Sequence, residues 1–384
     1  MRFLHLSDLH LGKSVNNYSM IDDQRYMLDE VLNIIDKKNL DAVLISGDVY
    51  DKMIASTEAI KLYDYFILEL VKRNLKVITI SGNHDSAVRL GSGADLIKLS
   101  GVYISKEFNG DVNPVTLSDD FGEVNFYMLP FIKPIHVKQT YNLPEQLSYT
   151  DSVKYVVDKM NIDTSKRNVI LSHQFVVGAD LSGSEEIITV GGVDNVNSEA
   201  YKDFDYVALG HIHRAQDVVK DKIRYCGTLL KYSFSEVNNK KTLTIVDLKE
   251  KGNLSIEEIE VYPKRDFAEL KGKYKDLTKS DFYNQVDRDK YYRIILTDEE
   301  ELVDVFKTLS DIYPNIMAVL YDNKRTQINN IINGASDVET KKPIELIDEF
   351  YLKQNNDSLN DRQKSYLDNK ISKIWEDRAW DHLN

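Results

Sequence analysis

In the stretch Leu44-Ile45-Ser46-Gly47-Asp48-Val49-Tyr50-Asp51, a short apolar run is followed by a glycine and two aspartates. Four other segments repeat this design. Asp-Leu-His (8–10), Gly-Asn-His-Asp (82–85), a lone His (173) and Gly-His-Ile-His (210–213) follow the apolar runs 2–6, 75–80, 168–171 and 205–209. Short runs rich in Val, Ile and Leu predict strands buried on both faces. The polar side chains are therefore expected at the carboxyl ends of central strands, where open α/β sheets bind ligands.

The residue types in these segments are typical of a centre for two divalent metal ions. Five of the eight histidines of the chain lie in them, which is more clustering than chance provides. Two ions about 3.5–4 Å apart can clamp a phosphate and generate a hydroxide nucleophile at neutral pH. Ions that close need an anionic bridge, for which Asp48 is the natural candidate. The remaining candidate ligands are Asp8, His10, Asn83, His173, His211 and His213.

The other polar residues of the motifs are predicted to serve the reaction or the turns. A donor set without thiolate suits Mn²⁺, iron, Zn²⁺ or Mg²⁺. His84 adjoins Asn83 and is predicted to act on the substrate, by stabilising developing charge or protonating the leaving oxygen. Asp51 and Asp85 are predicted to hold turns or to orient the metal-binding histidines. Each motif alone also occurs in packed, non-catalytic settings, but the joint set favours a two-metal phosphoesterase.

The five motifs resemble those of the calcineurin-type metallophosphoesterases. A narrower resemblance, to the SbcD nucleases of bacterial SbcCD complexes, rests on FLHLSDLHLGK (3–13), DYVALGHIHR (205–214) and GTLLKYSFSE (227–236). The stretch HQFV (173–176), with Val190-Gly191-Gly192 downstream, adds to it. This likeness covers residues 1 to about 265 well and the remainder loosely.

The resemblance implies an α/β fold and a division of the ligands between two ions. The fold is a four-layer metallophosphoesterase sandwich of two mixed β-sheets flanked by helices, with a small α/β capping domain and a C-terminal helical segment. One ion would be bound by Asp8, His10, Asp48 and His213, the other by Asp48, Asn83, His173 and His211, and His84 would be the catalytic histidine. Archaeal and eukaryotic relatives carry a second functional histidine where this chain has Asp51, so that role is not transferred.

The activity implied by the resemblance is that of a Mn²⁺-dependent DNA nuclease in DNA repair, recombination and replication. It would be an exonuclease on double-stranded ends and an endonuclease on hairpins or single strands. The expected partners are an SbcC-type ABC ATPase, double-stranded and hairpin DNA, and a second copy of the chain within a heterotetramer. Two alternatives remain open: a stand-alone small-molecule phosphodiesterase or phosphatase, and a catalytically inactive scaffold of the same fold. The additional C-terminal segments argue against the first, and the complete ligand set against the second.

Composition indicates an intracellular enzyme of more than one part. At 384 residues the chain exceeds a single hydrophobic core. One cysteine, Cys226, excludes a disulfide framework and suits a reducing, cytoplasmic setting. Asp8 and His10 interrupt the first apolar run, so no signal peptide is expected, and no run is long enough to cross a bilayer. The net charge of −13 does not exclude DNA, because phosphate affinity comes from local basic patches and bound metals.

Along the chain we expect a nuclease domain (1–262), a capping domain (263–325), a linker (326–343) and a helical segment for ATPase binding (344–384). Apolar stripes predict two helices, one capped by Asp22 and one that opens at Ser56 or Thr57. The alternation at 242–261 fits the second sheet of the sandwich. The capping domain should contain a strand (291–296), a helix (299–312) and a strand (316–321). Terminal stripes with Phe350, Ile371, Ile374 and Trp375 favour docking on a partner over packing within the chain.

Overall fold

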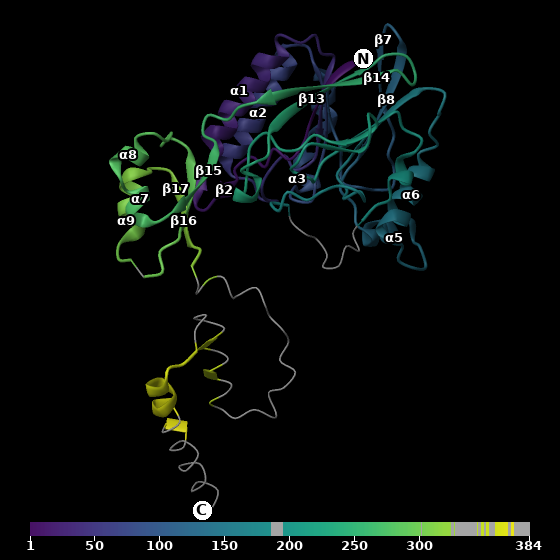
Figure 1. Cartoon of the computed structure of the whole chain (residues 1–384). Coiled ribbons are helices and arrows are strands. Elements are labelled where there is room, and N and C mark those ends of the chain that lie inside the picture. The colour runs from purple at the N-terminus through teal and green to yellow at the C-terminus, as the bar shows by residue number, and fades with distance from the viewer. Residues whose placement is uncertain are drawn as a thin grey trace, which may run out of the picture. The chain divides into compact units, whose positions relative to one another are not determined.

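The structure is a computed structural model that describes residues 1–185, 195–300 and 302–323, with 326, 344, 347–348, 351–352, 358–367 and 370–371. It divides into two compact units, Met1–Asp266 and Phe267–Asn384 (Figure 1). The predicted linker and most of the terminal segment, including Phe350, Ile374 and Trp375, lie outside the described residues, as do Val190-Gly191-Gly192.

The first sheet of the first unit has the strand order β14-β13-β1-β4-β5-β6. Four strands are parallel: β1 (Arg2–Leu6), β4 (Ala42–Ser46), β5 (Lys76–Ile80) and β6 (Val102–Ile104). The antiparallel pair β13 (Lys241–Leu248) and β14 (Leu254–Val261) joins at β1, with Phe3 opposite Val246. The expectation that 242–261 belongs to the second sheet is therefore wrong, because alternation marks a strand but not the sheet that it joins.

The second sheet has the order β11-β12-β10-β9-β8-β7. Its parallel centre is β8 (Gly122–Leu129), β9 (Arg167–Ser172), β10 (Tyr206–Leu209) and β12 (Ile223–Tyr225). Its antiparallel edges are β7 (Val115–Asp119) and β11 (Gln216–Val219). Both sheets are thus mixed, and the five strands that precede the motifs are divided between them.

Helices lie against the sheets. The helices α1 (Ile21–Ile35) and α2 (Thr57–Lys72) lie side by side, and α2 packs on β5 (Figure 1). The Ser56 side chain caps α2 by accepting from the Ala59 N–H, as predicted. The expected cap at Asp22 is wrong: Met20 occupies the cap position of α1, and Asp22 lies in the first turn, where its charge complements the helix dipole.

The core consists of layers set by strand alternation. Phe3, Leu44 and Ile78 of the first sheet meet Phe126 and Val169 of the second, so the two sheets face each other. The opposite face of the second sheet is covered by α5 (Pro134–Tyr141) and α6 (Tyr149–Lys159), whose buried valines join the apolar cluster there. Shorter elements are β2 (Ser14–Val15), β3 (Tyr18–Ser19), α3 (Ala87–Leu90), α4 (Ala94–Ile97), η1 (Lys98–Ser100), η2 (Ser198–Tyr201) and η3 (Phe234–Glu236).

The second unit holds a parallel sheet in the order β15-β16-β17. Its strands are β15 (Phe267–Gly272), β16 (Tyr291–Leu296) and β17 (Ile316–Tyr321), and its helices are α7 (Tyr274–Leu277), α8 (Ser280–Tyr283) and α9 (Val305–Ile312). Both predicted strands have the expected bounds. The predicted helix 299–312 begins later, because Asp304 takes a left-handed backbone (φ 54°) that a right-handed helix cannot include.

Candidate metal centre

The loops after five strands bring the predicted ligands together from both sheets. Asp8 and His10 follow β1, Asp48 follows β4, and Asn83 follows β5. His173 follows β9, and His211 and His213 follow β10. Hydrogen bonds join the two halves directly: the His211 N–H donates to both carboxylate oxygens of Asp8, at 3.0 and 3.1 Å. The sheets therefore meet at the carboxyl ends of their central strands.

Strained backbone aims these side chains inward. Asp8, His10, Asp48 and His211 have φ values of 51°, 43°, 50° and 98°, in the region that residues other than glycine rarely occupy. Such conformations cost on the order of 1–3 kcal/mol each and persist where the surroundings impose them. The carboxylate of Asp85 provides part of that support, because it accepts three backbone N–H groups at 2.9–3.0 Å, those of Val49, Tyr50 and Gly82.

Glycine is needed where two motifs approach most closely. A Cβ atom on Gly82 would lie 2.1 Å from Oδ1 of Asp48, and one on Gly210 would lie 2.0 Å from the carbonyl oxygen of Ser46. Neither position can hold a side chain without moving the backbone that carries a candidate ligand. These two glycines therefore set the spacing between the motifs.

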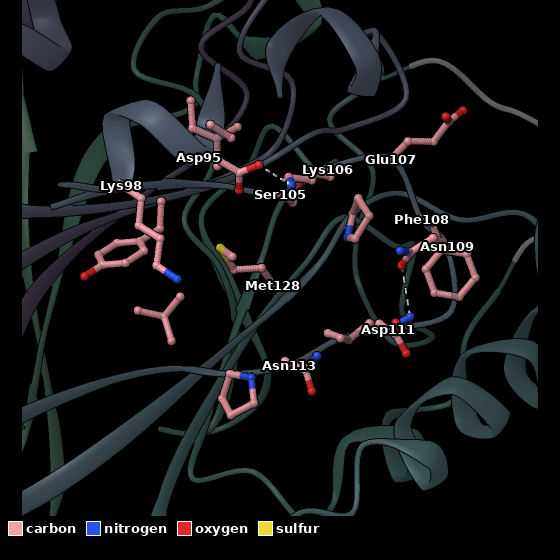
Figure 2. Close-up of a pocket in the computed structure, with 17 residues that line it drawn as sticks. Asp95, Lys98, Ser105, Lys106, Glu107, Phe108, Asn109, Asp111, Asn113 and Met128 are labelled. Carbon is pink, nitrogen blue, oxygen red and sulfur yellow. Dashed lines mark hydrogen bonds and ion pairs between the residues drawn. The ribbon is translucent and has the colours of Figure 1, made fainter. Parts of the chain in front are cut away.

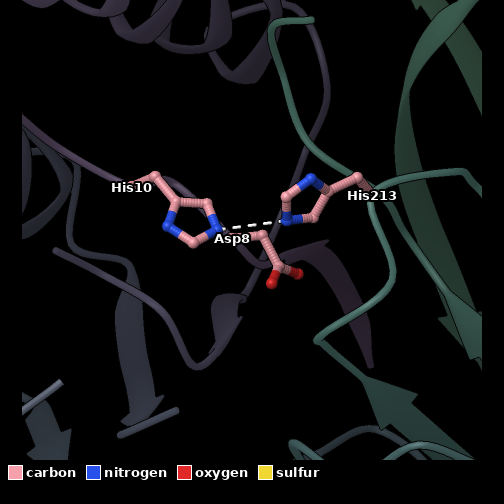
Figure 3. A group of neighbouring side chains, drawn as sticks. All are labelled: Asp8, His10 and His213. Atoms are coloured by element: carbon pink, nitrogen blue, oxygen red, sulfur yellow. Dashed lines mark hydrogen bonds between the residues drawn. The ribbon is translucent and has the colours of Figure 1, made fainter. Parts of the chain in front are cut away.

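One group of candidate ligands is formed by Asp8, His10 and His213 (Figure 3). The Nε2 atoms of the two imidazoles face each other at 3.1 Å, and all three side chains are buried. Two neutral imidazoles cannot both point lone pairs at one spot unless a proton or a cation lies between them. The donor types and their convergence therefore fit a divalent cation.

The remaining candidate ligands surround Asp48. Its Oδ2 lies 3.3 Å from Nε2 of His173 and 3.7 Å from Nε2 of His10, so one carboxylate lies within reach of both histidine groups. The Oδ1 of Asn83 lies 3.1 Å from Nε2 of His173 and 3.1 Å from Nδ1 of His211. Asp8, Asp48 and His173 form a further group that could hold an ion. The seven predicted ligands are thus gathered into one cluster, in which all but the partly exposed Asn83 are buried.

Electrostatics supports cation binding in this cluster. Burial raises the pKa of Asp8 to about 7, and the nearby charge of Asp48 adds to that shift. Against the effect of burial, His173, His10 and His84 hold the pKa of Asp48 well below its usual range. Burial lowers the pKa of His10 to about 3 and that of His211 to about 4, so both imidazoles are neutral and able to ligate. Against the effect of burial, the carboxylates of Asp48 and Asp8 raise the pKa of His173 to about 9. Two buried carboxylates beside the neutral imidazoles of His10 and His211 suit positive ions as compensation.

His84 lies at the edge of the cluster and is more exposed than the residues around it. Its side chain is 12% exposed, against 2% for Asp48. Its Nδ1–H donates to the Asp51 carbonyl at 2.9 Å, which turns Nε2 toward Asp48 Oδ2 at 3.9 Å. His84 also forms a possible metal-binding trio with His10 and Asp48. Geometry alone therefore permits both a ligand role and a role on the substrate.

The carboxylate of Asp51 has a different contact from the one expected. It accepts from Nζ of Lys13 at 2.6 Å, whereas Nδ1 of His10 lies 3.8 Å away, too far for a hydrogen bond. Among the described residues Nδ1 of His10 has no hydrogen-bond partner. Asp51 therefore contacts His84 through its carbonyl and Lys13 through its carboxylate, rather than orienting His10 directly.

Sequence reasoning missed several residues that support the cluster. Gln24 donates to the His10 carbonyl at 2.7 Å and to the Tyr232 hydroxyl at 3.0 Å, and Tyr232 donates to the Leu9 carbonyl at 2.7 Å. Ser184 lies 2.6 Å from Nδ1 of His213. Of these residues only Tyr232 lies in a segment, 227–236, that resembles the SbcD nucleases. The others could not be found from the sequence, because each bonds to a motif more than ten positions away.

Two hollows of the first unit lie elsewhere. One, drawn in Figure 2, has a volume of ≈ 390 Å³ and is lined by polar and apolar residues, among them Asp95, Lys98 and Lys106. A second hollow, of ≈ 480 Å³, is mainly apolar and is lined by residues of α2 and of the segment 86–104. None of the ten predicted site residues, all of them in the described part of the chain, lines either hollow.

Comparison with known proteins defines the class first. Residues 1–215 match the calcineurin-like phosphoesterase family, and residues 263–355 match the type 5 capsule protein repressor C-terminal domain. The first match covers more than half of the chain, so the chain belongs to the calcineurin-like phosphoesterases, whose fold implies bound divalent metals. The expected fold class, α/β with two mixed sheets and flanking helices, is confirmed.

A full-length relative narrows the family. The chain is 30% identical over 382 residues to the SbcD subunit of the SbcCD nuclease of Staphylococcus epidermidis, a match that covers 97% of this chain and 99% of that protein. Within the phosphoesterases it belongs to this SbcD family of hydrolytic nucleases, as the sequence resemblance predicted. A solved dimetal phosphatase from Danio rerio is similar at TM-score 0.42 and 13% identity, covering 68% of this chain and 97% of that one, an overlap too loose to carry an argument. In the described part of the chain no helix is both long and apolar enough to span a membrane.

Proposed function

We propose that this chain is a metal-dependent DNA nuclease that acts with an SbcC-type ABC ATPase, as an exonuclease on double-stranded ends and an endonuclease on hairpins or single strands. The observation that supports this function is the single, largely buried cluster holding Asp8, His10, Asp48, Asn83, His173, His211 and His213. The positive φ values of Asp8, His10, Asp48 and His211 direct these side chains into the cluster at a cost in backbone strain. An inactive scaffold would not need to bear that strain.

The proposed division of ligands follows the contacts. Asp8, His10, Asp48 and His213 would hold one ion, and Asp48, Asn83, His173 and His211 the other, with Asp48 bridging both. The ions, when bound, supply Lewis acidity and a metal-activated hydroxide nucleophile. Mn²⁺ is our preferred ion on the resemblance to the SbcD family, and the mixed set of imidazole, carboxylate and amide, which suits Mn²⁺, iron, Zn²⁺ or Mg²⁺, is compatible with it. The Ser46 carbonyl accepts from Nδ1–H of His173 at 2.7 Å, which turns Nε2 toward Asp48.

The bridging role of Asp48 has a direct test. Asp48→Ala should lose at least one of the two ions and all cleavage, because Oδ2 of Asp48 lies 3.7 Å from Nε2 of His10 and 3.3 Å from Nε2 of His173. Metal content is measured by elemental analysis of the purified full chain. Retention of two ions by the variant would remove the bridging assignment.

We assign His84 to the substrate rather than to the ions. Its backbone N–H donates to Asp48 at 2.9 Å and its Nδ1–H to the Asp51 carbonyl, so the ring is held at the exposed edge of the cluster. From there Nε2 can stabilise charge on the phosphate or protonate the leaving oxygen. His84→Ser should keep both ions and DNA binding and lower the cleavage rate by roughly 10²-fold or more. A collapse of metal content together with the rate would make His84 a ligand instead.

The substrate class is tested by parallel assays on the full chain. Mn²⁺-dependent cleavage of a hairpin duplex, measured beside hydrolysis of bis-p-nitrophenyl phosphate, separates the nuclease from a small-molecule phosphodiesterase. The nuclease should cut the hairpin at nanomolar to micromolar DNA, with His84→Ser inactive on both substrates. Hydrolysis of the small diester without any cleavage of DNA ends, hairpins or single strands would favour the alternative enzyme.

The C-terminal part is assigned to substrate selection and partner binding. We propose a nuclease domain at 1–262, a capping domain at 263–325, a linker at 326–343 and an ATPase-binding segment at 344–384. Phe350, Ile371, Ile374 and Trp375 would anchor that segment in a groove of the ATPase. Deleting 340–384 should spare Mn²⁺-dependent cleavage by the isolated subunit and weaken both co-purification with the ATPase and ATP-dependent cleavage. A truncated chain with a lowered Tm and poor solubility would instead indicate packing within the chain.

A surface of the first unit suits pairing with a second copy in a heterotetramer. Apolar residues beside the ≈ 480 Å³ hollow are unusually exposed: Met53 62%, Ile54 71%, Leu68 53%, Leu96 77% and Leu99 93%. Exposed apolar residues that gather on one surface mark interaction sites. Leu68→Glu should convert a dimer to a monomer in light scattering, whereas Phe121→Glu, which alters a 46%-exposed aromatic elsewhere, should not. We place the complex in the cytoplasm, where the free, buried Cys226 is in keeping with a reducing setting.

A further inference from the structure

His213 has one ring nitrogen in the metal cluster and the other in contact with a separate segment of the chain. Its Nε2 faces Nε2 of His10 at 3.1 Å, within the group shown in Figure 3. Its Nδ1, on the opposite edge of the ring, lies 2.6 Å from the Ser184 hydroxyl oxygen. The tautomer of His213 therefore depends on which way the Ser184 hydroxyl points.

The Ser184 hydroxyl belongs to a short series of hydrogen bonds that ends on a carboxylate. Ser184 Oγ lies 2.9 Å from Ser182 Oγ, and Ser182 Oγ donates to Oε1 of Glu185 at 2.7 Å. The same carboxylate accepts the backbone N–H groups of Gly183 and His213, both at 2.9 Å. The backbone N–H groups of Ser182 and Ser184 also donate to this carboxylate, at 3.0–3.2 Å, so both of its oxygens act as acceptors.

The carboxylate sets the direction of every bond in the series. Because both oxygens of the Glu185 carboxylate accept backbone N–H groups, the Ser182 O–H is the donor in its bond to Glu185. The lone pairs of Ser182 Oγ then accept the O–H of Ser184, and the lone pairs of Ser184 Oγ accept from His213. A neutral imidazole carries one proton. When that proton lies on Nδ1, Nε2 has a free lone pair directed toward His10.

We propose that Ser184, Ser182 and Glu185 form a positioning relay that fixes His213 in its Nδ1–H tautomer and so presents Nε2 to a divalent cation. The inference rests on the proposed function, because it takes His213 to be a metal ligand. The relay is a carboxylate–histidine–metal arrangement with two hydroxyls placed between the carboxylate and the imidazole. Its three members act through His213 and contact neither an ion nor the substrate.

The relay segment is fixed to the motif that it serves. Glu185 holds the His213 backbone N–H as well as the hydroxyl series, so ring and backbone are set by one carboxylate. Five residues before Glu185, Asp180 exchanges two hydrogen bonds with the Gln216 side chain on β11, at 2.8 and 2.7 Å. On the other side of His213, Lys241 donates to its carbonyl at 3.0 Å. The imidazole is therefore held in position as well as in its tautomer.

The test compares Ser184→Ala with Ser184→Thr in the full chain, with Ser182→Ala as a second break in the relay. Ser165→Ala is the matched control, because it removes an exposed serine hydroxyl that donates to a carboxylate, Asp163, far from the cluster. Calorimetric titration with Mn²⁺ measures both sites. Nitrogen-15 NMR of labelled imidazoles in the metal-free protein, with His213→Asn to assign the signal, reports the tautomer.

We expect each alanine variant of the relay to weaken one of the two Mn²⁺ sites by roughly 10–100-fold and to leave the other unchanged. The His213 signal should shift from Nδ1–H to a mixture of tautomers, Ser184→Thr should restore both readouts, and Ser165→Ala should match the parent protein. An unchanged tautomer, or unchanged Mn²⁺ affinity in folded Ser184→Ala and Ser182→Ala, overturns the relay. Failure of the parent protein to bind two Mn²⁺ ions would instead contradict the proposed function.

Discussion

Lys241 makes one of the few fully buried ion pairs in the described part of the chain, and its removal should be costly. Its ammonium contacts Oε2 of Glu236, Oγ1 of Thr228 at 2.6 Å and the His213 carbonyl at 3.0 Å. The side chains of Lys241 and Glu236 are 4% and 0% exposed. Lys241→Met fits the same volume but leaves the Glu236 charge without a partner.

The magnitude follows from what each contact loses. Leaving one member of a buried pair uncompensated costs about 3–5 kcal/mol. The His213 carbonyl keeps a second donor, the Thr228 N–H at 3.1 Å, so losing the Lys241 hydrogen bond to that carbonyl adds little to the total loss of stability. We therefore expect the free energy of unfolding to fall by about 3–5 kcal/mol and Tm by roughly 10 °C. Adding Glu236→Gln removes the unpaired charge and still accepts from the Tyr232 N–H, so the double variant should recover most of the loss.

Urea unfolding of the full chain, followed by circular dichroism for each single variant and the pair, gives the coupling between the two residues. The control is Lys240→Met, the neighbouring lysine, whose side chain is 76% exposed and whose contact with Glu260 should contribute little. A loss of less than about 1 kcal/mol for Lys241→Met, or a double variant less stable than that single variant, would refute the uncompensated-charge reasoning.

Other expectations concern acid stability, spacing, turn support and metal removal. Against the effect of burial, Arg167 and the Met1 amino group hold the pKa of Asp119 well below its usual range. The contribution of Asp119 to the free energy of unfolding is therefore complete above the pKa of the unfolded chain, about 3.9, and is lost as pH falls below it. Asp119→Asn should consequently flatten the decline of Tm between about pH 5 and pH 2. Gly82→Ala should fold with reduced stability and lose Mn²⁺ binding in calorimetry, because its Cβ would meet Oδ1 of Asp48 at 2.1 Å. Asp85→Ala, which leaves three backbone N–H groups without their acceptor, should lower the free energy of unfolding by about 2–4 kcal/mol in urea, whereas Asp85→Asn should retain part of it. Chelation should lower Tm in scanning calorimetry, since bound ions stabilise the native state alone, and added Mn²⁺ should restore it.

The sequence located the chemistry well because each motif is local. A strand, a tight turn and the residues that it presents lie within about ten positions, so the five strands before the motifs could be predicted close to their observed bounds. The assignment of 242–261 failed because pairing is a long-range property: Leu4 lies opposite Ile245 for reasons that no local pattern records. The contacts of Gln24, Ser184 and Glu185 with the histidines could not be predicted for the same reason, because they join residues far apart in the sequence. Asp51 shows the limit within a motif, since Lys13 takes its carboxylate.

The position of β1 has a consequence for synthesis on the ribosome. This first strand is a central one, and its partner β13 begins more than two hundred residues later. At roughly 5–20 residues per second, a nascent chain would wait on the order of 10–50 s before β13 is made. During that interval the edge of β1 is open to wrong pairing, and His211 and His213 are also absent for most of it. A ribosome-bound fragment ending before residue 210 would therefore have no complete nuclease centre, so cutting activity could begin only when the catalytic unit closes on itself.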